Sequence, residues 1–522
     1  MAFDAPSLTW AAALLLGTTI FVYGLRSRRV RSKLPLPPGP KKLPLLGNIL
    51  DIPSARPWEQ YMAWSKEYNT DILHLDLAGT SLIVLSSLKA TEDLMDKRSS
   101  IYSDRARLPM IVELVGWDFN VALMRYGDQW RTHRRLFNQR FIPKAAEKYR
   151  PQQVLATHRL LRRLQQTPDD FVDHFKHWAA QIIMSTAYGI DVKQQDDPYV
   201  AIAHDAIHSS SEAAVFGRFL VDAIPWLKHV PAWLPGAGFK RQARAWRPIV
   251  RKMADVPFAE TKRQMDLGIA PASFAAESLQ RLRDGEDTYY TEDTVRATAA
   301  TMFIGGADTS VSALQIFVLA MLANPEAQRR AQAEVDAVTG GQQLPEYPDE
   351  AAMPYVAAVV KEVMRWRNVL PIALPHNLMA EDEYRGYRIP AGSIIIGNTW
   401  AILHDEVTYP DPYSFKPERW LLDGKLNPAV QSPDAAFGYG RRFCPGRHTA
   451  SASVWIAVAS MLATLNITKA KDEHGAEIEP TYEFDEGIIS APLPFQCCIS
   501  PRTHSAAELI RRTAQDEMPS SG

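Results

Sequence analysis

Phe437-Gly-Tyr-Gly-Arg-Arg-Phe-Cys-Pro-Gly446 is the stretch of sequence that decides the fold. It contains Cys444, one of three cysteines in the chain and the only one set among glycines. Glycines let the backbone approach a flat ligand closely, and the N–H groups of such a loop can bond a thiolate sulfur. The pattern predicts that Cys444 is the axial ligand of a haem iron, with Phe437 covering one side and Arg442 holding a propionate. A glycine turn around an ordinary buried cysteine is the alternative.

The other two cysteines, Cys497 and Cys498, lie in the apolar run 494–499, which has the composition of a strand and contains no glycine. We expect both to be buried and structural. Three cysteines without CxxC spacing also argue against a disulfide framework or a structural zinc site, and they suit a reducing compartment.

The overall composition is that of an ordinary globular protein. The 522 residues are 46% hydrophobic and 22% charged, with a formal net charge of −1 at pH 7. A chain this close to neutral lacks the basic surplus of nucleic-acid-binding proteins, so we expect no nucleic-acid partner. Because no internal repeat or low-complexity tract interrupts the sequence, one continuous domain is favoured.

The amino-terminal segment has the pattern of a membrane anchor. The stretch 8–25 carries no charge and is followed at once by basic residues, namely Arg26, Arg28, Arg29, Arg31 and Lys33. About eighteen helical residues span roughly 27 Å, enough for a bilayer core. Since the positive charges follow the apolar stretch, an uncleaved single-pass anchor over residues 1–25 is favoured over a cleaved signal peptide, with the main domain in the cytosol. A buried core helix is the alternative.

Three further regions follow the anchor. Residues 26–48 are basic and rich in proline, which predicts a stiff hinge that cannot continue a helix. The catalytic domain is expected over residues 49–505, with a hairpin around Ala78-Gly79-Thr80, mostly helical spacing beyond it, and short strands near 388–396 and the carboxyl end. Residues 506–522 are expected to form a loose polar tail.

The helix expected over Thr294–Leu322 is apolar on nearly every face and should run through the core. It contains Gly305-Gly-Ala-Asp-Thr-Ser310. Each mid-helix glycine costs about 1 kcal/mol relative to alanine, and an aspartate in an apolar helix costs more. We expect the Thr309 hydroxyl to bond the carbonyl near Gly305 and open the helix, leaving room for dioxygen and water, while Asp308 passes protons inward. A tolerated kink is the alternative.

A basic helix near residue 130 presents two faces. Trp130 and Arg134 stand four residues apart on one face, where the indole N–H and the guanidinium can both reach a haem propionate. Arg131 and Arg135 should then point away from the haem and form a docking surface for an electron-donating protein. Taken alone, the first pair would be an ordinary surface cation near an aromatic ring.

Glu362 and Arg365 stand at i and i+3 on another helix, a common surface pattern of little energetic weight. Arg419 in Pro417-Glu-Arg-Trp420 supplies a second arginine. If the three close a buried network, loss of one member would cost roughly 3–5 kcal/mol, and the network would hold the scaffold of the Cys444 loop.

Other polar patterns predict little. His204 with His208, and His174 with His177, have metal-binding spacing but no third ligand, so we expect solvated helix faces. Gly438-Tyr-Gly440 lacks the third glycine of a dinucleotide loop, and no phosphate loop occurs. A chain without flavin or nicotinamide motifs must receive its electrons from another protein.

These features stand in an order that resembles the cytochrome P450 family over about residues 30–505. Residues 374–378, 384–392 and 437–448 resemble fungal secondary-metabolite members more narrowly. The resemblance implies a mainly α P450 fold with small β-sheets, preceded by a transmembrane helix in the endoplasmic reticulum. It also implies haem b as cofactor, with His376 joining Arg442, Trp130 and Arg134 on the propionates. Electrons from NADPH would arrive through NADPH–cytochrome P450 reductase, with cytochrome b5 as an additional donor.

The sequence thus predicts a haem-thiolate monooxygenase that inserts one atom of O2 into a small hydrophobic molecule, such as a terpenoid, an indole or an aromatic polyketide. The pocket wall is expected from the segments 108–119, 216–220, 302–307 and 369–374, with Ile488 and Ile489. The alternatives are an isomerase, dehydratase or peroxide-dependent enzyme of the same fold, and a haem or lipophile carrier without turnover. The substrate, the carbon attacked, the number of oxidation steps and the oligomeric state stay open.

Overall fold

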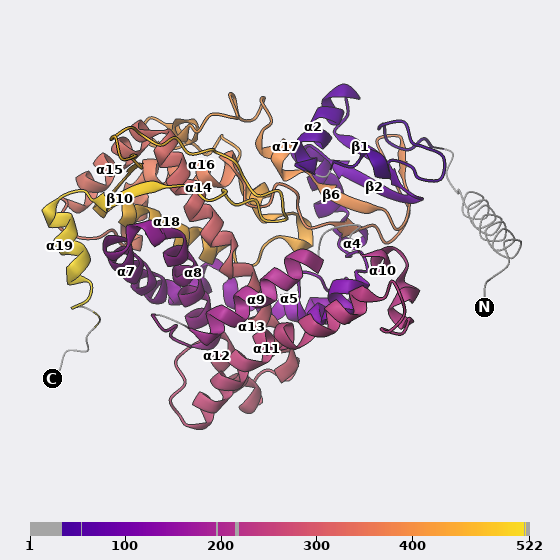
Figure 1. Cartoon of the computed structure of the whole chain (residues 1–522), viewed down its shortest axis with the longest axis horizontal. Helices are drawn as coiled ribbons and strands as arrows, with labels where there is room; N and C mark the ends of the chain where they lie inside the picture. The colour runs from indigo at the N-terminus through magenta and orange to yellow at the C-terminus, as the bar shows by residue number, and fades with distance from the viewer. Residues whose placement is uncertain (1–33, 54, 195–196, 214–218, 516, 518–522) are drawn as a thin grey trace, which may run out of the picture.

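The computed structural model describes residues 34–53, 55–194, 197–213, 219–515 and 517. The predicted anchor over residues 1–25 and the first part of the predicted hinge lie outside these residues. The described chain forms a mainly helical body, with a small β-rich region at one end where α2 (Pro57–Glu67) lies against a sheet (Figure 1). The expected fold class of helices with small sheets is confirmed.

Helices carry most of the structure. The longer ones are α5 (Asp128–Phe141), α7 (Arg150–Gln166), α8 (Phe171–Tyr188), α9 (Pro198–Ala213), α11 (Gly238–Asp266), α12 (Phe274–Arg283), α13 (Glu292–Ala307), α14 (Thr309–Ala323), α15 (Pro325–Thr339), α16 (Pro354–Trp366), α18 (Arg447–Thr464) and α19 (His504–Arg512). Shorter helical segments include α3 (Leu88–Thr91), α4 (Ser99–Tyr102), α6 (Pro143–Ala146), α10 (Leu220–Ala223), α17 (Thr399–Leu403), η3 (Pro109–Val115), η9 (Pro417–Trp420), η10 (Asp434–Phe437) and η11 (Gly440–Arg442).

The main sheet has the strand order β1-β2-β6-β3, with β2 and β6 parallel and the other pairs antiparallel. The strands are β1 (Ile72–Leu77), β2 (Thr80–Leu85), β3 (His376–Asn377) and β6 (Ile394–Gly397), and the two-stranded sheets pair β4 (Asp382–Tyr384) with β5 (Tyr387–Ile389), β7 (Leu421–Leu422) with β8 (Lys425–Leu426), and β9 (Leu465–Lys469) with β10 (Cys497–Pro501). The expected hairpin is present, and its turn residues Ala78 (φ 49°) and Gly79 (φ 91°) both take the left-handed conformation of a tight hairpin.

The expected central helix is present as two helices. Thr291 caps α13 by accepting a hydrogen bond from the backbone N–H of Thr294 at 3.2 Å, and Asn324-Pro325 ends α14. The stretch Val311–Leu322 is buried throughout, which places α14 in the core beside α16 and α18. Within the described chain, Glu292–Ala323 is the one stretch long and apolar enough to cross a bilayer, but 67% of its apolar 18-residue window is buried inside the protein. It is therefore a core element here.

The described part of the predicted hinge lies against the domain. It forms no helix up to Asn48, as its prolines require. The carbonyl oxygens of Pro35 and Pro38 accept hydrogen bonds from the N–H groups of Arg388 (2.8 Å) and His74 (2.9 Å). This part of the chain is therefore attached to β5 and β1.

The expectation of a loose tail beyond residue 506 is wrong as far as Arg512. Thr503 caps α19 by accepting from the N–H of Ala506 at 3.0 Å, and Leu509 and Ile510 are buried. Arg162 of α7 donates to the Thr513 hydroxyl at 2.6 Å. Two apolar residues in a polar segment are a weak pattern, and the surface they pack against belongs to other helices, α7 and α18.

Two smaller expectations also need correction. His174 is only 7% exposed and lies 2.8 Å from the Thr167 carbonyl oxygen, so it is a core residue and not part of a solvated face. Cys497 is buried as expected, but Cys498 is exposed because neighbouring residues of β10 point to opposite sides. The side chains of His204 and His208 lie outside what the structure describes.

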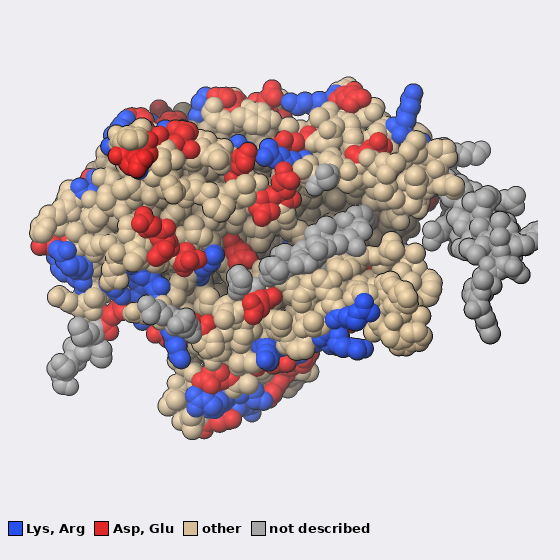
Figure 2. Space-filling model, in the orientation of Figure 1, with Lys and Arg blue, Asp and Glu red and all other residues tan. Residues whose placement is uncertain are grey.

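The surface shows no single dominant charge on the face in view. Basic and acidic side chains alternate there in small groups separated by uncharged residues (Figure 2).

Candidate functional site

The Cys444 loop is held by close backbone contacts. The N–H of Cys444 donates to the carbonyl oxygen of Phe437 at 2.9 Å, which closes the loop. Gly440 (φ 55°) lies so near the main chain of η2 (Glu92–Lys97) that a Cβ atom would overlap the carbonyl oxygen of Met95. Gly438 (φ 87°) supplies the other left-handed residue. The backbone conformation at these two positions therefore favours glycine.

The sulfur of Cys444 lies at the amino end of α18. Loss of hydration raises the pKa of its thiol, while the backbone N–H groups of Gly446 and Arg447 and the positive charge of Arg134 act in the opposite direction. These N–H groups begin an 18-residue helix, whose dipole also favours a negative charge at this end. A thiol in such surroundings loses its proton outright when a cation coordinates it.

Three arginines gather around the loop. Arg134 donates to the carbonyl oxygen of Phe443 at 2.5 Å. Arg442 donates to the carbonyl oxygens of Ser103 (2.8 Å) and Met124 (2.7 Å), and its guanidinium carbon lies 4.3 Å from the centre of the Trp130 ring. The structure therefore brings together Trp130, Arg134 and Arg442, as the sequence predicted.

The third arginine, Arg105, was missed by the sequence analysis. It is 6% exposed and donates to the carbonyl oxygens of Ala122, Leu374 and Pro375 at 2.5–2.9 Å. A single arginine in an irregular segment has no spacing that marks it as functional. The only available signal was its place just before the predicted pocket wall.

The positive charge of this group is not compensated within the described chain. Arg105, Arg134 and Arg442 form no ion pair with a carboxylate there, because nearby Asp104 is engaged by Arg125 (2.8 Å) and by the N–H of Tyr126. Burial lowers the pKa of Arg105 and of Arg134 to about 10, and burial with the repulsion of Arg105 lowers the pKa of Arg442 to about 8. Such a group favours a bound anion with more than one carboxylate.

His376 completes this group from β3. It is 2% exposed, and its Nδ1 lies 2.7 Å from the carbonyl oxygen of Tyr102. Burial, and then the charges of Arg105 and Arg442, hold its pKa well below the usual value. Arg105 and Arg442 therefore lie close enough to His376 to disfavour its protonation.

The joint between α13 and α14 has the predicted hydrogen bond. The Thr309 hydroxyl donates to the carbonyl oxygen of Gly305 at 2.9 Å, and the helical ladder resumes where the N–H of Ser312 donates to the carbonyl oxygen of Asp308 at 3.0 Å. Gly306 packs closely against α8, because a Cβ atom there would lie 3.0 Å from the Ile183 Cδ1 atom. The Val121 N–H donates to the Thr301 hydroxyl and its carbonyl oxygen accepts from Arg442, so one residue connects α13 to the Cys444 loop.

The predicted buried network is present. Glu362 and Arg365 are fully buried and form two hydrogen bonds of 2.9 and 2.8 Å. Arg419 reaches Glu362 at 3.1 Å, and the Trp420 indole N–H donates to the same carboxylate at 3.0 Å. The network joins α16 to η9, and the chain leads from there to the Cys444 loop.

A family model described as Cytochrome P450 matches residues 37–499. This chain belongs to the cytochrome P450 family. Cytochrome P450 monooxygenase 98 of Postia placenta is 44% identical over 95% of this chain and 96% of its own length. Tryptamine 4-monooxygenase of Psilocybe cyanescens is 43% identical over 94% of this chain and 97% of its own length. Cytochrome P450 monooxygenase ple1 of Rhodocybe pseudopiperita is 42% identical over 97% and 98%.

This P450 is accordingly a monooxygenase, and its family uses haem, O2 and electrons derived from NADPH. The residues present fit a haem. The Cys444 sulfur lies beside the N–H groups of Gly446 and Arg447, which suits an iron ligand. The buried arginines without carboxylate partners among the described residues suit the two propionates. Cys444 would hold the iron, while Arg105, Arg134, Arg442, His376 and Trp130 would hold the propionates.

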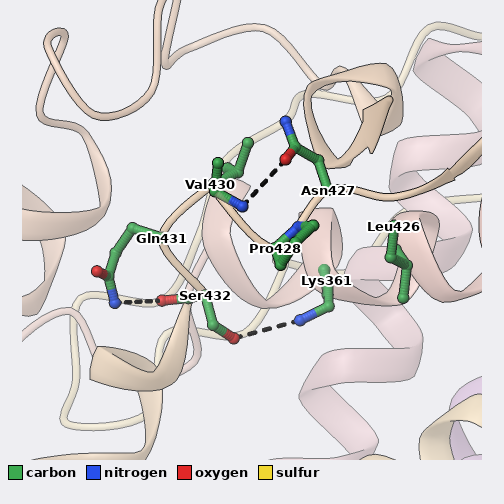
Figure 3. A pocket seen from close by; sticks show the side chains of 8 residues that line it. Lys361, Leu426, Asn427, Pro428, Val430, Gln431 and Ser432 are labelled. Carbon is green, nitrogen blue, oxygen red and sulfur yellow. Dashed lines mark hydrogen bonds between the residues drawn. The ribbon is translucent and has the colours of Figure 1, made fainter. Parts of the chain in front are cut away.

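One hollow of the P450 surface lies apart from this site. It measures about 380 Å³ and lies between Lys361 and the loop 426–432, where the Lys361 Nζ is 3.2 Å from the Ser432 hydroxyl (Figure 3). None of the residues predicted for the site lines it. We assign it no function.

Proposed function

We propose that this P450 inserts one atom of O2 into a small, largely apolar secondary metabolite, with electrons delivered by NADPH–cytochrome P450 reductase and, in addition, by cytochrome b5. The observation that carries the proposal is the Cys444 loop, whose sulfur is oriented by the amino end of α18 beside uncompensated arginines. The indole, terpenoid and aromatic polyketide classes all suit an apolar pocket. The name of the tryptamine 4-monooxygenase relative favours an indole among them.

Different side chains of the site have different roles in the proposed reaction. The bound haem would be haem b and would supply oxygen activation, with the Cys444 thiolate donating electron density. Thr309 holds a hydroxyl at the opened turn of the helix, where it can orient water, and Asp308 beside it can take up and release a proton. Glu362, Arg365 and Arg419 keep η9 and the following loop in position. The protein thereby supplies orientation and control of water.

We propose the endoplasmic-reticulum membrane as its location, with residues 1–25 as a single-pass anchor and the domain in the cytosol. Exposed apolar side chains support this proposal. Leu45, Leu46 and Leu50 are 48–71% exposed close to the described start of the chain, and Trp226 and Trp233 are 64% and 78% exposed. Exposed tryptophans are typical of protein surfaces that meet a membrane interface.

Replacement of Cys444 by alanine tests the haem assignment. The parent enzyme should show the red-shifted carbonyl band of a thiolate-bound ferrous haem, and Cys444→Ala should lose it while Cys498→Ala keeps it. A normal band in Cys444→Ala would overturn the assignment. Consumption of NADPH with reductase and substrate then separates a monooxygenase from an isomerase, a peroxide-dependent enzyme or a carrier. Metabolite profiling after expression beside neighbouring biosynthetic genes identifies the substrate.

A further inference from the structure

Parts of three of the four segments expected to form the pocket wall meet in one hydrophobic cluster, whereas Val369, Ile372 and Ala373 pack elsewhere and Ile488 is 44% exposed. The cluster includes Met110 and Ile111 of η3, Phe219 and Val221 at α10, and Met302 and Phe303 of α13. Seven residues of helix separate Met302 from Thr309, a rise of about 10 Å along the axis. Met302 of the cluster therefore lies about two helical turns from Thr309 at the joint.

Asp222 places a carboxylate at the edge of this cluster. It lies on α10 (Figure 1), next to buried Val221, and α10 packs against η3. Its Oδ1 accepts a hydrogen bond from the N–H of Met110 at 2.8 Å. This bond fixes the carboxylate against the start of η3. Burial raises the pKa of Asp222 to about 6, although the Met110 N–H acts in the opposite direction.

Other acids near these segments have cationic partners. Glu113 of η3 pairs with Arg107 at 2.7 Å and with Lys228 at 2.5 Å, and Asp118 pairs with Arg251. Across the described residues, no lysine, arginine or histidine forms an ion pair with Asp222. A carboxylate removed from water without a cation is costly, so a cation from outside the protein would stabilise it.

We propose that Asp222 binds the ammonium group of the substrate, which is a small amine whose ring lies against the apolar cluster. This inference rests on the proposed function, since it names the substrate class of the same monooxygenase site. The charge pair would orient the molecule along the cluster and set which carbon lies nearest the site of oxidation. A role limited to capping η3 is the competing explanation.

Matched pairs of ligands separate the two explanations. The full haem-loaded chain is titrated with tryptamine and indole-3-ethanol, and with 2-phenylethylamine and 2-phenylethanol, following the spin-state shift of the haem spectrum. Each pair differs in an ammonium or a hydroxyl group. In the parent enzyme we expect at least one amine to bind more tightly than its alcohol, with a shift to shorter wavelength.

Asp222→Asn keeps an oxygen for the Met110 N–H and removes the charge. It should raise the Kd of the favoured amine about tenfold or more and change the Kd of the matching alcohol less than twofold. Asp255→Asn is the control, because Asp255 on α11 already pairs with Arg296 at 2.6 Å. It should change neither Kd.

Three results would overturn the proposal. One is an equal effect, or none, of Asp222→Asn on amine and alcohol, which leaves Asp222 as a cap of η3 only. Another is a parent enzyme that binds neither amine more tightly than its alcohol. The third is an amine-induced shift to longer wavelength, which places the amine on the iron. The carbonyl band of the same preparations tests the haem-thiolate assignment separately. If that band is normal, any of these three results contradicts the Asp222 proposal alone.

Discussion

Thr309 uses its hydroxyl to bond the Gly305 carbonyl and can still accept a hydrogen bond from water. Thr309→Ala removes the hydroxyl without filling the pocket. We expect product formed per NADPH to fall about tenfold, less than the 10²–10⁴-fold loss typical when an acid–base group is removed, because Asp308 and water keep part of the proton path. Peroxide should account for the missing electrons. Thr309→Ser is the control, and unchanged coupling in Thr309→Ala would mean that the hydroxyl is dispensable.

Buried histidines should make the protein sensitive to acid. Burial lowers the pKa of His74 to about 4, and burial with the charge of Arg365 lowers that of His404 to about 3. Between pH 6.5 and 4 the unfolded chain takes up protons at these positions and the folded protein does not, so stability falls as pH falls. Each histidine should remove about 1.4 kcal/mol per pH unit.

The urea dependence of unfolding at pH 7, 6 and 5 measures this slope. Over this range His404→Gln should reduce the slope by about 1 kcal/mol per pH unit, because the full value of about 1.4 kcal/mol per unit applies only well below about pH 6.5. His474→Gln, at a residue whose side chain is 82% exposed, serves as the control. An identical slope in parent and His404→Gln would contradict the prediction.

At the scale of single residues, the sequence predicted those members of the site that belong to a local pattern. Cys444 has its glycines within a few positions, and Glu362 and Arg365 stand one helical turn apart. Arg105 has no such pattern. The burial of Arg105 depends on segments far away in the chain, such as the Leu374 and Pro375 carbonyls that it reaches across about 270 positions. Residue spacing carries no information on contacts of this kind.

At the scale of elements, the contacts of Glu362 determine how α16 and η9 are held together. Glu362→Gln keeps the shape of the side chain but leaves Arg365 and Arg419 without a counter-charge in a buried place. We expect it to cost about 3–5 kcal/mol of unfolding free energy and to lower the haem content of purified protein.

Glu418→Gln is the matched control, because Glu418 lies next to Arg419 but its side chain is 51% exposed and pairs with Arg330. An exposed pair contributes at most about 1 kcal/mol. A loss below about 1 kcal/mol in Glu362→Gln would show that the buried network does not support the scaffold.

Elements with a strong period or clear end signals were predictable, and weak ones were not. The hairpin at Ala78-Gly79 and the central helix have such signals, and both formed within a few residues of the expected bounds. Helix α19 buries Ala506, Ala507, Leu509 and Ile510 against α7 and α18, so its stability depends on contact with these helices. The break at Asp308 was expected as a local opening, and the structure extends it to a change of helix.

At the scale of the whole molecule, the exposed side of α5 is available to a redox partner. Arg131 lies over the Tyr126 ring and pairs with Asp128 at 2.6 Å, while Arg135 is exposed above the Tyr289 ring. Trp130 and Arg134 on the same helix turn inward. The helix thus separates residues turned toward the Cys444 loop from residues facing solvent.

Charge reversal at Arg131 and Arg135 should slow turnover driven by the reductase about tenfold at low salt and less at high salt, because electrostatic steering is screened. Turnover driven by peroxide should stay unchanged. Arg329→Glu, at an exposed arginine of α15, is the control for a general effect of charge. Equal loss in both assays would indicate damage to the haem site and no docking role.

The backbone amides at the joint between α13 and α14 and those of the following helix differ in how easily solvent reaches them. Residues 311–322 are enclosed on all sides, so their amide protons can exchange with deuterium only when the core itself unfolds. The amides next to Asp308 lie where the ladder is interrupted, beside residues that are only partly buried. Mass spectrometry of deuterated peptides should therefore show early exchange over 305–310 and the latest exchange of the chain over 311–322. Ligand binding should slow amide exchange over 305–310 and leave exchange over 311–322 unchanged. The motion that admits a substrate would then be confined to the one helical turn at the joint.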